Sequence, residues 1–256
     1  MTERIVSAAI VIIGNEILSG RTADRNMPFL ASRLNELGIQ VREARVVPDL
    51  EAEIVRAVNE CRARHDYVFT TGGIGPTHDD ITGDAIAKAF GVGIDYHPQA
   101  MAILRAHYAG SGAELNEARM RMARIPFGAE LVENPVSKAP GYHLGNVFVL
   151  AGVPAIMQAM FESLKHELVG GQPVRSLSIA VYLAEGAIAK GLGELAARYP
   201  DVDLGSYPFY RQGRFGTSIV GRSTDEGRLQ AAAAELRQLM RGLGGEPLEE
   251  STNSPG

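Results

Sequence analysis

Apolar and polar positions alternate along the first 170 residues in a way that predicts strands separated by helices. Residues 5–14 form an almost unbroken β-branched and small apolar run, typical of a strand buried on both faces of a parallel sheet. Residues 39–47 and 66–71 predict two further strands. Helical spacing of apolar positions covers residues 24–38, 49–64 and 82–91. Strands alternating with helices indicate a doubly wound α/β domain.

The ends of these helices carry recognisable signals. Pro28 suits a first helical turn, and Gly38 and Gly91 suit the position just after a last turn. Asp49 is the predicted N-cap of the helix over 49–64, and Thr82 caps the helix that follows the glycine-rich stretch. Each helix is therefore predicted to have a defined start or stop.

The remaining pattern predicts a second, smaller domain. Helices are expected over 98–108, 116–124 and 154–167, with a hairpin turned at Gly145-Asn146, and residues 169–174 are a linker candidate. The order then changes to strand (176–183), helix (185–198), strands (203–210 and 214–221) and helix (224–243). The prediction is one α/β domain over 1–170, a small α+β domain over 171–245, and a disordered tail over 246–256 without a periodic apolar face.

Composition narrows the class of protein. The 256 residues carry a formal net charge of −5 and no block of Lys or Arg, which argues against nucleic acid as a partner. No apolar run is long enough to span a membrane and no leader is evident, so we expect a cytoplasmic protein without a membrane partner. The single Cys61 excludes an internal disulfide and a Cys-based zinc site.

The stretch "TTGGIGPTHDDITGD", residues 70–84, lies between a predicted central strand and a helix. Glycines let the backbone approach a ligand, and the helix that follows presents unpaired N–H groups, so the stretch suits a phosphate. Asp79 and Asp80 would repel a bare phosphate, but they fit a bridging divalent cation or a general base. The alternative is a glycine turn in which Asp79, Asp80 and Thr82 compete to cap the helix.

A second group of polar residues is predicted at the same edge of the sheet. Glu16 follows the first strand, Asp24 and Asn26 precede the first helix, and Asp49 follows the second strand. Because the carboxyl ends of parallel strands meet at one edge, these residues jointly favour a site there. Taken singly, Asp24 and Asp49 are equally explained as caps and Glu16 as a solvated side chain.

The sequence resembles a known family. The stretches "GNEILSGRTADRN", "TTGGIGPTHDDITGDAIAKAFG", "NEARMRMARIP", "NPVSKAPGY" and "LAGVPAIM" occur in the order found in the molybdopterin-binding (MoaB/Mog-like) domain of CinA-type competence/damage-inducible proteins. The resemblance covers roughly residues 4–168, in a stand-alone form without the amidase domain. The C-terminal part, with "AEGAIA" and "LGSYP", resembles the segment that follows this domain in relatives and in the N-terminal half of animal-type FAD synthases.

The resemblance implies a three-layer α/β/α fold with a mostly parallel sheet, followed by a small α+β domain, in a homo-oligomer (dimer or trimer). In such relatives the aspartates matching Asp80 and Asp49 are tied to activity, and the glycine loop holds a phosphate. Asp79 and Asp80 are the expected metal ligands, for Mg, Mn or Co. The expected phosphate- or nucleotide-binding residues are Glu16, Asp24, Asn26, Thr71, Gly72, Gly73, Gly75, Pro76, Thr77, Thr82, Lys138, Gly152 and Pro154.

The functional expectation is a metal-dependent nucleotide pyrophosphatase that cleaves an ADP-ribose-like or FAD-like dinucleotide. The alternatives are a molybdopterin-binding adenylyltransferase or carrier, and a non-catalytic nucleotide-binding regulatory module. Two departures bear on activity: Ala151 and Ile156 stand where the family usually has Pro and Glu. Lys138 stands where a small hydroxyl residue is common, and it either reaches a phosphate or is a solvated loop lysine.

Overall fold

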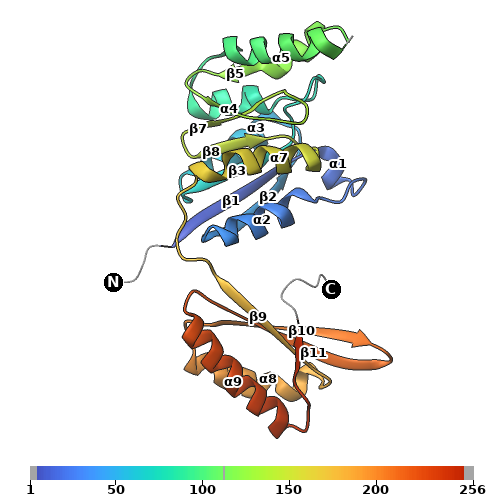
Figure 1. Cartoon of the computed structure of the whole chain (residues 1–256), viewed down its shortest axis with the longest axis vertical. Coiled ribbons are helices and arrows are strands. Elements are labelled where there is room, and N and C mark those ends of the chain that lie inside the picture. Colours follow the sequence, from blue (N-terminus) through green and yellow to red (C-terminus); the bar gives the residue numbers. More distant parts are fainter. Residues whose placement is uncertain (1–4, 112, 251–256) are drawn as a thin grey trace. The chain divides into compact units, whose positions relative to one another are not determined.

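The computed structural model describes residues 5–111 and 113–250. The chain divides into two compact units, Met1–Gln172 and Pro173–Gly256, which Figure 1 shows in blue to yellow and in orange to red. Each unit has its own hydrophobic core.

The main sheet of the first unit is mostly parallel, as the apolar runs predict. In the described residues its six strands lie in the order β2 (Ile39–Val47), β1 (Val6–Ile13), β3 (Tyr67–Thr71), β8 (Val147–Leu150), β7 (Gly141–Leu144) and β6 (Glu130–Val132). The first four run parallel to one another, whereas β7 is antiparallel to both of its neighbours, β8 and β6. The carboxyl ends of β1, β3 and β8 therefore lie side by side.

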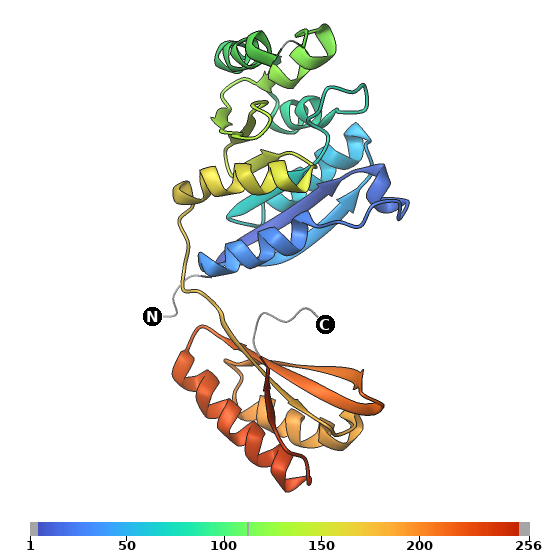
Figure 2. The ribbon, with the colours of Figure 1, turned by 45° about the vertical axis from the view of Figure 1, so that its right-hand side comes forward.

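Helices cover both faces of this sheet, which confirms the three-layer architecture. Figures 1 and 2 show α2 (Asn26–Glu36) and α7 (Pro154–Leu164) on one face, and α3 (Glu51–Arg62) and α4 (Thr82–Phe90) on the other. Successive residues of β1 enter opposite cores, Ala8, Ile10 and Ile12 with α2 and α7, and Ala9, Val11 and Ile13 with α3 and α4. A strand buried on both faces requires the continuous apolar run seen in the sequence.

Further helices, turns and strands complete the first unit. They are α1 (Asn15–Leu18), β4 (Ile94–Tyr96), α5 (Pro98–Ser111), α6 (Glu117–Met120), the 3-10 turns η1 (Arg121–Ala123) and η2 (Lys165–Glu167), and β5 (Arg124–Pro126). The helix predicted over 116–124 is wrong beyond Met120. Residues 124–126 pair with β4 and bury Ile125, and this tertiary pairing overrides the helical pattern.

The predicted N-caps of α3 and α4 are also wrong. Leu50 occupies the cap position of α3 and Ile81 that of α4, and neither helix has a side-chain cap. Asp49 and Thr82 make other hydrogen bonds, described below. Gly38 and Gly91 do follow their helices in the left-handed conformation, with φ of 74° and 68°.

The second unit is the predicted small α+β domain. Its antiparallel sheet has the order β10 (Asp203–Arg211), β11 (Arg214–Ser223), β9 (Arg175–Val181) and β12 (Leu248–Glu250). The helices α8 (Glu185–Arg198) and α9 (Glu226–Gly242) pack on one face around Ile179, Ile219 and Leu236. The β10–β11 hairpin turns at Gln212-Gly213, where both residues have positive φ.

The prediction of a disordered tail from residue 246 is wrong for residues 248–250, which form β12 beside β9; the rest of the predicted tail, 251–256, lies outside the described residues. Glu250 holds this strand: its carboxylate accepts hydrogen bonds from Ser178 (2.8 Å), Ser218 (2.5 Å) and Arg211 (2.6 Å). Glu250 lies on the face of the sheet away from the helices. A strand held by such a polar side chain lacks a periodic apolar pattern, which is why the sequence did not predict it.

Glu250→Gln is expected to destabilise folding by about 1 kcal/mol at pH 7. Partial burial raises the pKa of Glu250, but hydrogen bonds from Ser218, Arg211 and Ser178 outweigh it and leave the pKa below its usual 4.5. Because the folded-state pKa is lower than the unfolded-state pKa, the ionised carboxylate stabilises the folded protein above the unfolded-state pKa. This stabilisation is lost as pH falls through the folded-state pKa. Chemical unfolding from pH 3 to 7 should show the difference from wild type shrink in acid. Glu246→Gln, at an exposed position, is the control; an equal effect there would contradict the role of Glu250.

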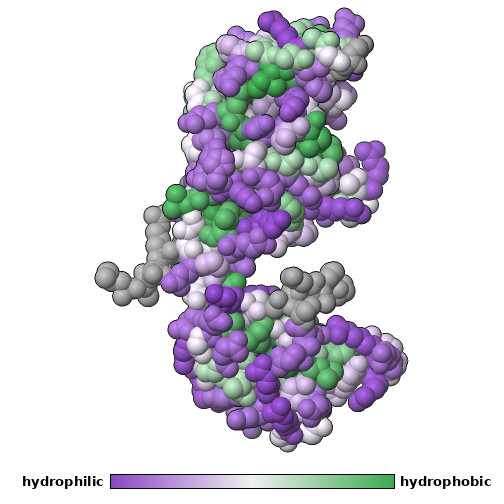
Figure 3. All heavy atoms as spheres, in the orientation of Figure 1, coloured by the Kyte–Doolittle hydropathy of each residue, from purple (hydrophilic) through white to green (hydrophobic). Residues whose placement is uncertain are grey.

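No helix in the described part of the chain is long and apolar enough to cross a membrane. The face drawn in Figure 3 is covered mainly by hydrophilic residues, with separate hydrophobic areas between them.

Candidate functional site

A cleft of about 640 Å³ opens at the carboxyl edge of the parallel strands. The strands β1, β3 and β8 end at Ile13, Thr71 and Leu150, so the segments that follow them meet at this edge. The cleft brings together most of the residues predicted from sequence: Glu16, Asp49, Gly72, Gly73, Gly75, Pro76, Thr77, Asp79, Asp80, Gly152 and Pro154 all line it.

The glycine loop after β3 presents backbone donors to this cleft. Gly72 and Gly73 have φ of 102° and 68°, a conformation that only glycine adopts readily. In the described structure the N–H groups of Gly73, Ile74 and Gly75 donate to no acceptor. Consecutive N–H groups that face one concave surface form an anion-binding nest.

Close packing leaves no room for side chains at these glycines. A Cβ on Gly72 would lie 2.2 Å from the carbonyl oxygen of Ile13, and one on Gly73 would lie 2.1 Å from Oγ1 of Thr82. A Cβ on Gly152 would lie 3.2 Å from Cα of Gly72. The segments after three strands therefore approach each other backbone to backbone.

Asp80 closes the far end of the loop. Its Oδ2 accepts hydrogen bonds from the backbone N–H (2.7 Å) and the hydroxyl (2.5 Å) of Thr77. A Cβ on Gly75 would lie 2.7 Å from the same oxygen, so a larger residue there would displace the Asp80 carboxylate. Asp79 is exposed on the same loop and lines the cleft beside Asp80.

Two further carboxylates reach the cleft from the first strand end. Asp49 accepts a hydrogen bond from the N–H of Asn15 (2.8 Å), the first residue of α1, and does not cap α3 as predicted. Glu16 lies on α1 and its carboxylate covers Gly14, where a Cβ would be 2.5 Å from Oε1. The short helix α1 thus holds Glu16 and Asp49 beside each other on the rim.

Thr71 and Thr82 do not line the cleft, which corrects their predicted role as phosphate ligands. Both side chains are buried. The Thr82 hydroxyl donates to the carbonyl of Gly72 (3.0 Å), and its N–H donates to the carbonyl of Gly73 (3.0 Å). Thr82 therefore fixes the glycine loop from beneath instead of touching a ligand.

Thr82→Val is expected to destabilise folding by about 1–2 kcal/mol, because the buried Gly72 carbonyl loses its donor without a change in side-chain shape. Binding of an anionic ligand in the cleft should weaken several-fold, since the loop loses its support. Thr217→Val in the second unit is a matched control: Thr217 is also buried and donates to the carbonyl of Leu183 (2.9 Å). Thermal unfolding and calorimetric titration with ADP should show both variants destabilised but only Thr82→Val impaired in binding. Equal affinities would contradict the role of Thr82.

Asp24, Asn26 and Lys138, which are predicted to bind the ligand, lie outside the lining of the cleft. Asp24 accepts from the N–H groups of Asn26 (3.3 Å) and Met27 (2.9 Å) at the start of α2. Asn26 is buried and donates to the carbonyl of Gly152 (2.8 Å), and so supports the cleft wall. Lys138 is exposed in a turn with φ of 64°, which agrees with the solvated alternative.

Sequence reasoning missed much of the opposite wall. Asn134 shapes a turn there: its Oδ1 accepts from the N–H groups of Val136 and Ser137, and its Nδ2 donates to the Ala139 carbonyl (2.8 Å). The sequence did contain a signal for this wall, because "NEARMRMARIP" and "NPVSKAPGY" belong to the family resemblance. These stretches do not stand at a strand end, so strand-end reasoning did not place them at the cleft. The missed lining residues include Tyr108, Met122, Asn134, Ser137, Ala139, Val153 and Met160; Arg119 and Ile156 also line the cleft.

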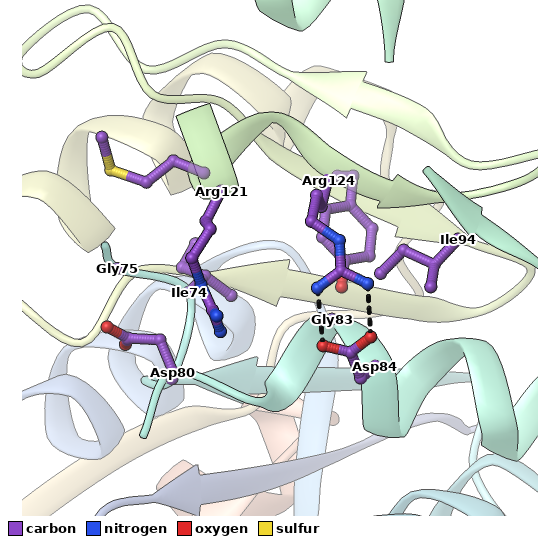
Figure 4. Close-up of a pocket in the computed structure, with 11 residues that line it drawn as sticks. Ile74, Gly75, Asp80, Gly83, Asp84, Ile94, Arg121 and Arg124 are labelled. Carbon is purple, nitrogen blue, oxygen red and sulfur yellow. Dashed lines mark hydrogen bonds and ion pairs between the residues drawn. The ribbon is translucent and has the colours of Figure 1, made fainter. Parts of the chain in front are cut away.

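A small chamber of about 30 Å³ adjoins the glycine loop (Figure 4). Arg124 closes one side through a bidentate ion pair with Asp84, at 2.8 and 3.1 Å. The Tyr142 hydroxyl faces the chamber, is buried and has no hydrogen-bond partner in the described residues. Burial, together with the charge of Asp84, raises the pKa of Tyr142, so the hydroxyl stays neutral. The space suits a molecule the size of water.

The charge of the main cleft is negative. Among the described residues its lining has four carboxylates, Glu16, Asp49, Asp79 and Asp80, against one cationic side chain, Arg119. No three His, Cys, Asp or Glu residues of the described chain are grouped closely enough to hold a metal ion by themselves. One or two carboxylates with phosphate oxygens and water are, however, a usual ligand set for Mg²⁺.

The fold and cleft define a class of protein: a three-layer α/β domain that presents a glycine loop and carboxylates to a ligand at its carboxyl edge. Residues 9–170 match the family described as "probable molybdopterin binding domain", and the chain belongs to that family. Residues 173–243 match the middle domain of FAD synthase.

Relatives support the same assignment. The chain is 37% identical over 264 residues to a protein of Aeropyrum pernix, covering 96% of this chain and 97% of that one. It is 33% identical over 260 residues to a probable FAD synthase of Caenorhabditis elegans, covering 92% of this chain and 50% of that protein. It therefore spans about half the length of that synthase.

A solved structure shares the fold. The crystal structure of CinA, with unknown function, from Thermoplasma acidophilum has 36% sequence identity and a TM-score of 0.59. It covers 63% of this chain and 96% of that chain. The resemblance to CinA-type proteins and FAD synthases inferred from the motifs is thus confirmed.

Proposed function

We propose that the cleft binds the diphosphate of an ADP-ribose-like or FAD-like dinucleotide and hydrolyses its phosphoanhydride bond with the help of a divalent cation. The proposal rests on one observation: backbone hydrogen-bond donors and carboxylates occur in the same cleft. Gly73, Ile74 and Gly75, whose N–H groups donate to no acceptor in the described structure, line the cleft together with four carboxylates. Backbone donors suit phosphate oxygens, whereas carboxylates do not.

A divalent cation resolves this conflict of charge. Four carboxylates against one arginine leave the described lining near −3, before a diphosphate adds its own negative charge. Asp79 and Asp80 fit a cation that arrives with the substrate, because phosphate oxygens and water complete its ligand set. When bound, the cation neutralises charge on the phosphate oxygens. The residues of the chain then position the diphosphate against the loop.

The proposed reaction adds water to one phosphorus atom. The water oxygen forms the new P–O bond, and the bond from that phosphorus to the bridging oxygen breaks with its electron pair. Two phosphate monoesters result, and the protons of the water pass to the products or to solvent. The loop N–H groups stabilise negative charge on the non-bridging oxygens. Asp80 or Asp49 orients the water, since both carboxylates line the cleft.

The size of the cleft suits a dinucleotide or a pterin. A volume of about 640 Å³ falls within the usual range for small-molecule sites. Apolar side chains of Tyr108, Met122 and Ile156 provide area for a flat ring.

The second candidate is a molybdopterin-handling protein. The description of the family favours it, and the same glycine loop would bind the phosphate of the pterin. The two candidates differ in chemistry: a pterin carrier retains its ligand, whereas a pyrophosphatase releases monophosphates.

The test offers purified protein ADP-ribose, FAD and NAD with Mg²⁺, Mn²⁺ or Co²⁺ and separates the products chromatographically. AMP released in the presence of a cation and absent with a chelator is the expected result. Absence of cleavage with every pair would contradict the pyrophosphatase. A fluorescent pterin that copurifies and resists dialysis would then support the carrier, and its absence would favour a regulatory module.

A further inference from the structure

Three arginines lie close together on the segment over the glycine loop, but only one of them has no partner. Arg124 is paired with Asp84. Arg119 donates to the carbonyl of Glu114, and its guanidinium lies 4.8 Å from the ring centre of Tyr108. Arg121 makes no hydrogen bond or ion pair to any described residue, although it is partly buried.

The surrounding structure aims Arg121 at the loop. Figure 4 shows its side chain extending from η1 toward Gly75 and Asp80, while Arg124 turns away to Asp84. The Arg124–Asp84 ion pair joins the end of η1 to α4, the helix that follows the loop. Segment and loop are therefore held at a fixed distance, with the guanidinium between them.

A partly buried guanidinium without a counter-ion is unfavourable unless an anion completes it. Asp80 is the nearest candidate inside the protein, but the two side chains form no ion pair within 4.0 Å, and the carboxylate is already held by Thr77. Arg121 and the residues Gly73, Ile74 and Gly75, whose N–H groups donate to no described acceptor, line the same small chamber.

We propose that Arg121 binds the non-bridging oxygens of a diphosphate ester, opposite the glycine loop, and so forms a second phosphate subsite at the mouth of the small chamber. The inference rests on the proposed function, since it names the side chain that recognises the diphosphate. The fork of N–H donors in arginine matches phosphate oxygens in pairs, whereas a lysine offers one point charge. Arg121 distinguishes a diphosphate from a single phosphate held by the loop alone.

Equilibrium binding tests this assignment without turnover. Titration calorimetry with ADP, AMP and inorganic pyrophosphate should show Arg121→Ala weakening ADP and pyrophosphate on the order of 10- to 100-fold. AMP, which the loop holds, should weaken much less. Arg121→Lys should recover part of the loss. Arg105→Ala, on an exposed face of α5 and outside both cavities, removes the same charge as a control.

Kinetics with the cleaved dinucleotide then separates binding from chemistry. If Arg121 holds the diphosphate in both ground and transition states, Arg121→Ala raises KM with little change in kcat. Unchanged ADP affinity in Arg121→Ala, an equal loss for AMP, or no binding of ADP and pyrophosphate to wild type would each overturn the subsite. If the wild type cleaves nothing, but Arg121→Ala binds ADP more weakly than the wild type does, the pyrophosphatase proposal is overturned and the subsite proposal stands. Melting temperatures of all variants exclude misfolding.

Discussion

Asp80→Asn is expected to lower kcat/KM for phosphoanhydride cleavage by roughly 10²–10³-fold, while the melting temperature stays within about 2 °C of wild type. Asparagine keeps one side-chain oxygen, which takes the place of the Asp80 Oδ2 that accepts from the Thr77 N–H and hydroxyl, so both hydrogen bonds survive. Only the negative charge is lost. Because the proposed roles of Asp80 are to hold a cation or orient water, the charge is what turnover requires.

Two comparisons separate this charge from the architecture of the loop. Asp80→Ala removes the acceptor as well, so it should lose both turnover and about 1–2 kcal/mol of folding free energy. Asp95→Asn is the matched control, because Asp95 likewise accepts from a backbone N–H (Tyr96, 2.7 Å) but lines neither cavity. Full activity in Asp80→Asn would mean that this carboxylate serves only to shape the loop. Activities and melting temperatures measured on the same preparations decide between the two roles.

The sequence predicted the parts of the site that depend on local order along the chain. Strands buried on both faces show as apolar runs, and a parallel sheet places their carboxyl ends at one edge. Glu16, Asp49 and the glycine loop follow such ends, so their meeting around one cleft could be foreseen. Their role in catalysis stays a prediction.

Pairings between distant segments could not be foreseen. The N-cap rule assigned Asp49 and Thr82 to the helices next to them, but Asp49 bonds Asn15, 34 residues away, and the Thr82 hydroxyl bonds Gly72, 10 residues away. Likewise Arg124 pairs with Asp84 across 40 residues, whereas Arg121 pairs with none of the described residues. Local propensity describes which bonds a side chain is able to make, whereas the tertiary fold selects among them.

Gly73→Ala is expected to destabilise the first unit by about 2–5 kcal/mol and to abolish measurable nucleotide binding. Gly73 has φ of 68°, and alanine in this conformation costs about 1 kcal/mol or more. Its Cβ would also lie 2.1 Å from the Thr82 hydroxyl oxygen and 3.2 Å from Thr82 Cβ, both in a buried side chain without room to move. Relief of this overlap shifts the loop and displaces the N–H groups that face the cleft.

Gly91→Ala isolates the conformational part of this cost. Gly91 has the same φ of 68°, but a Cβ there meets no atom within 4 Å, so only about 1 kcal/mol should be lost. The excess in Gly73→Ala is then steric, and it should couple to Thr82. In a double-mutant cycle with Thr82→Ala, which removes the overlapping oxygen, the cost of Gly73→Ala should fall by about 1–3 kcal/mol. Denaturant unfolding of the four proteins measures this coupling. Additive costs would show that the loop yields elsewhere and that Thr82 does not fix its position.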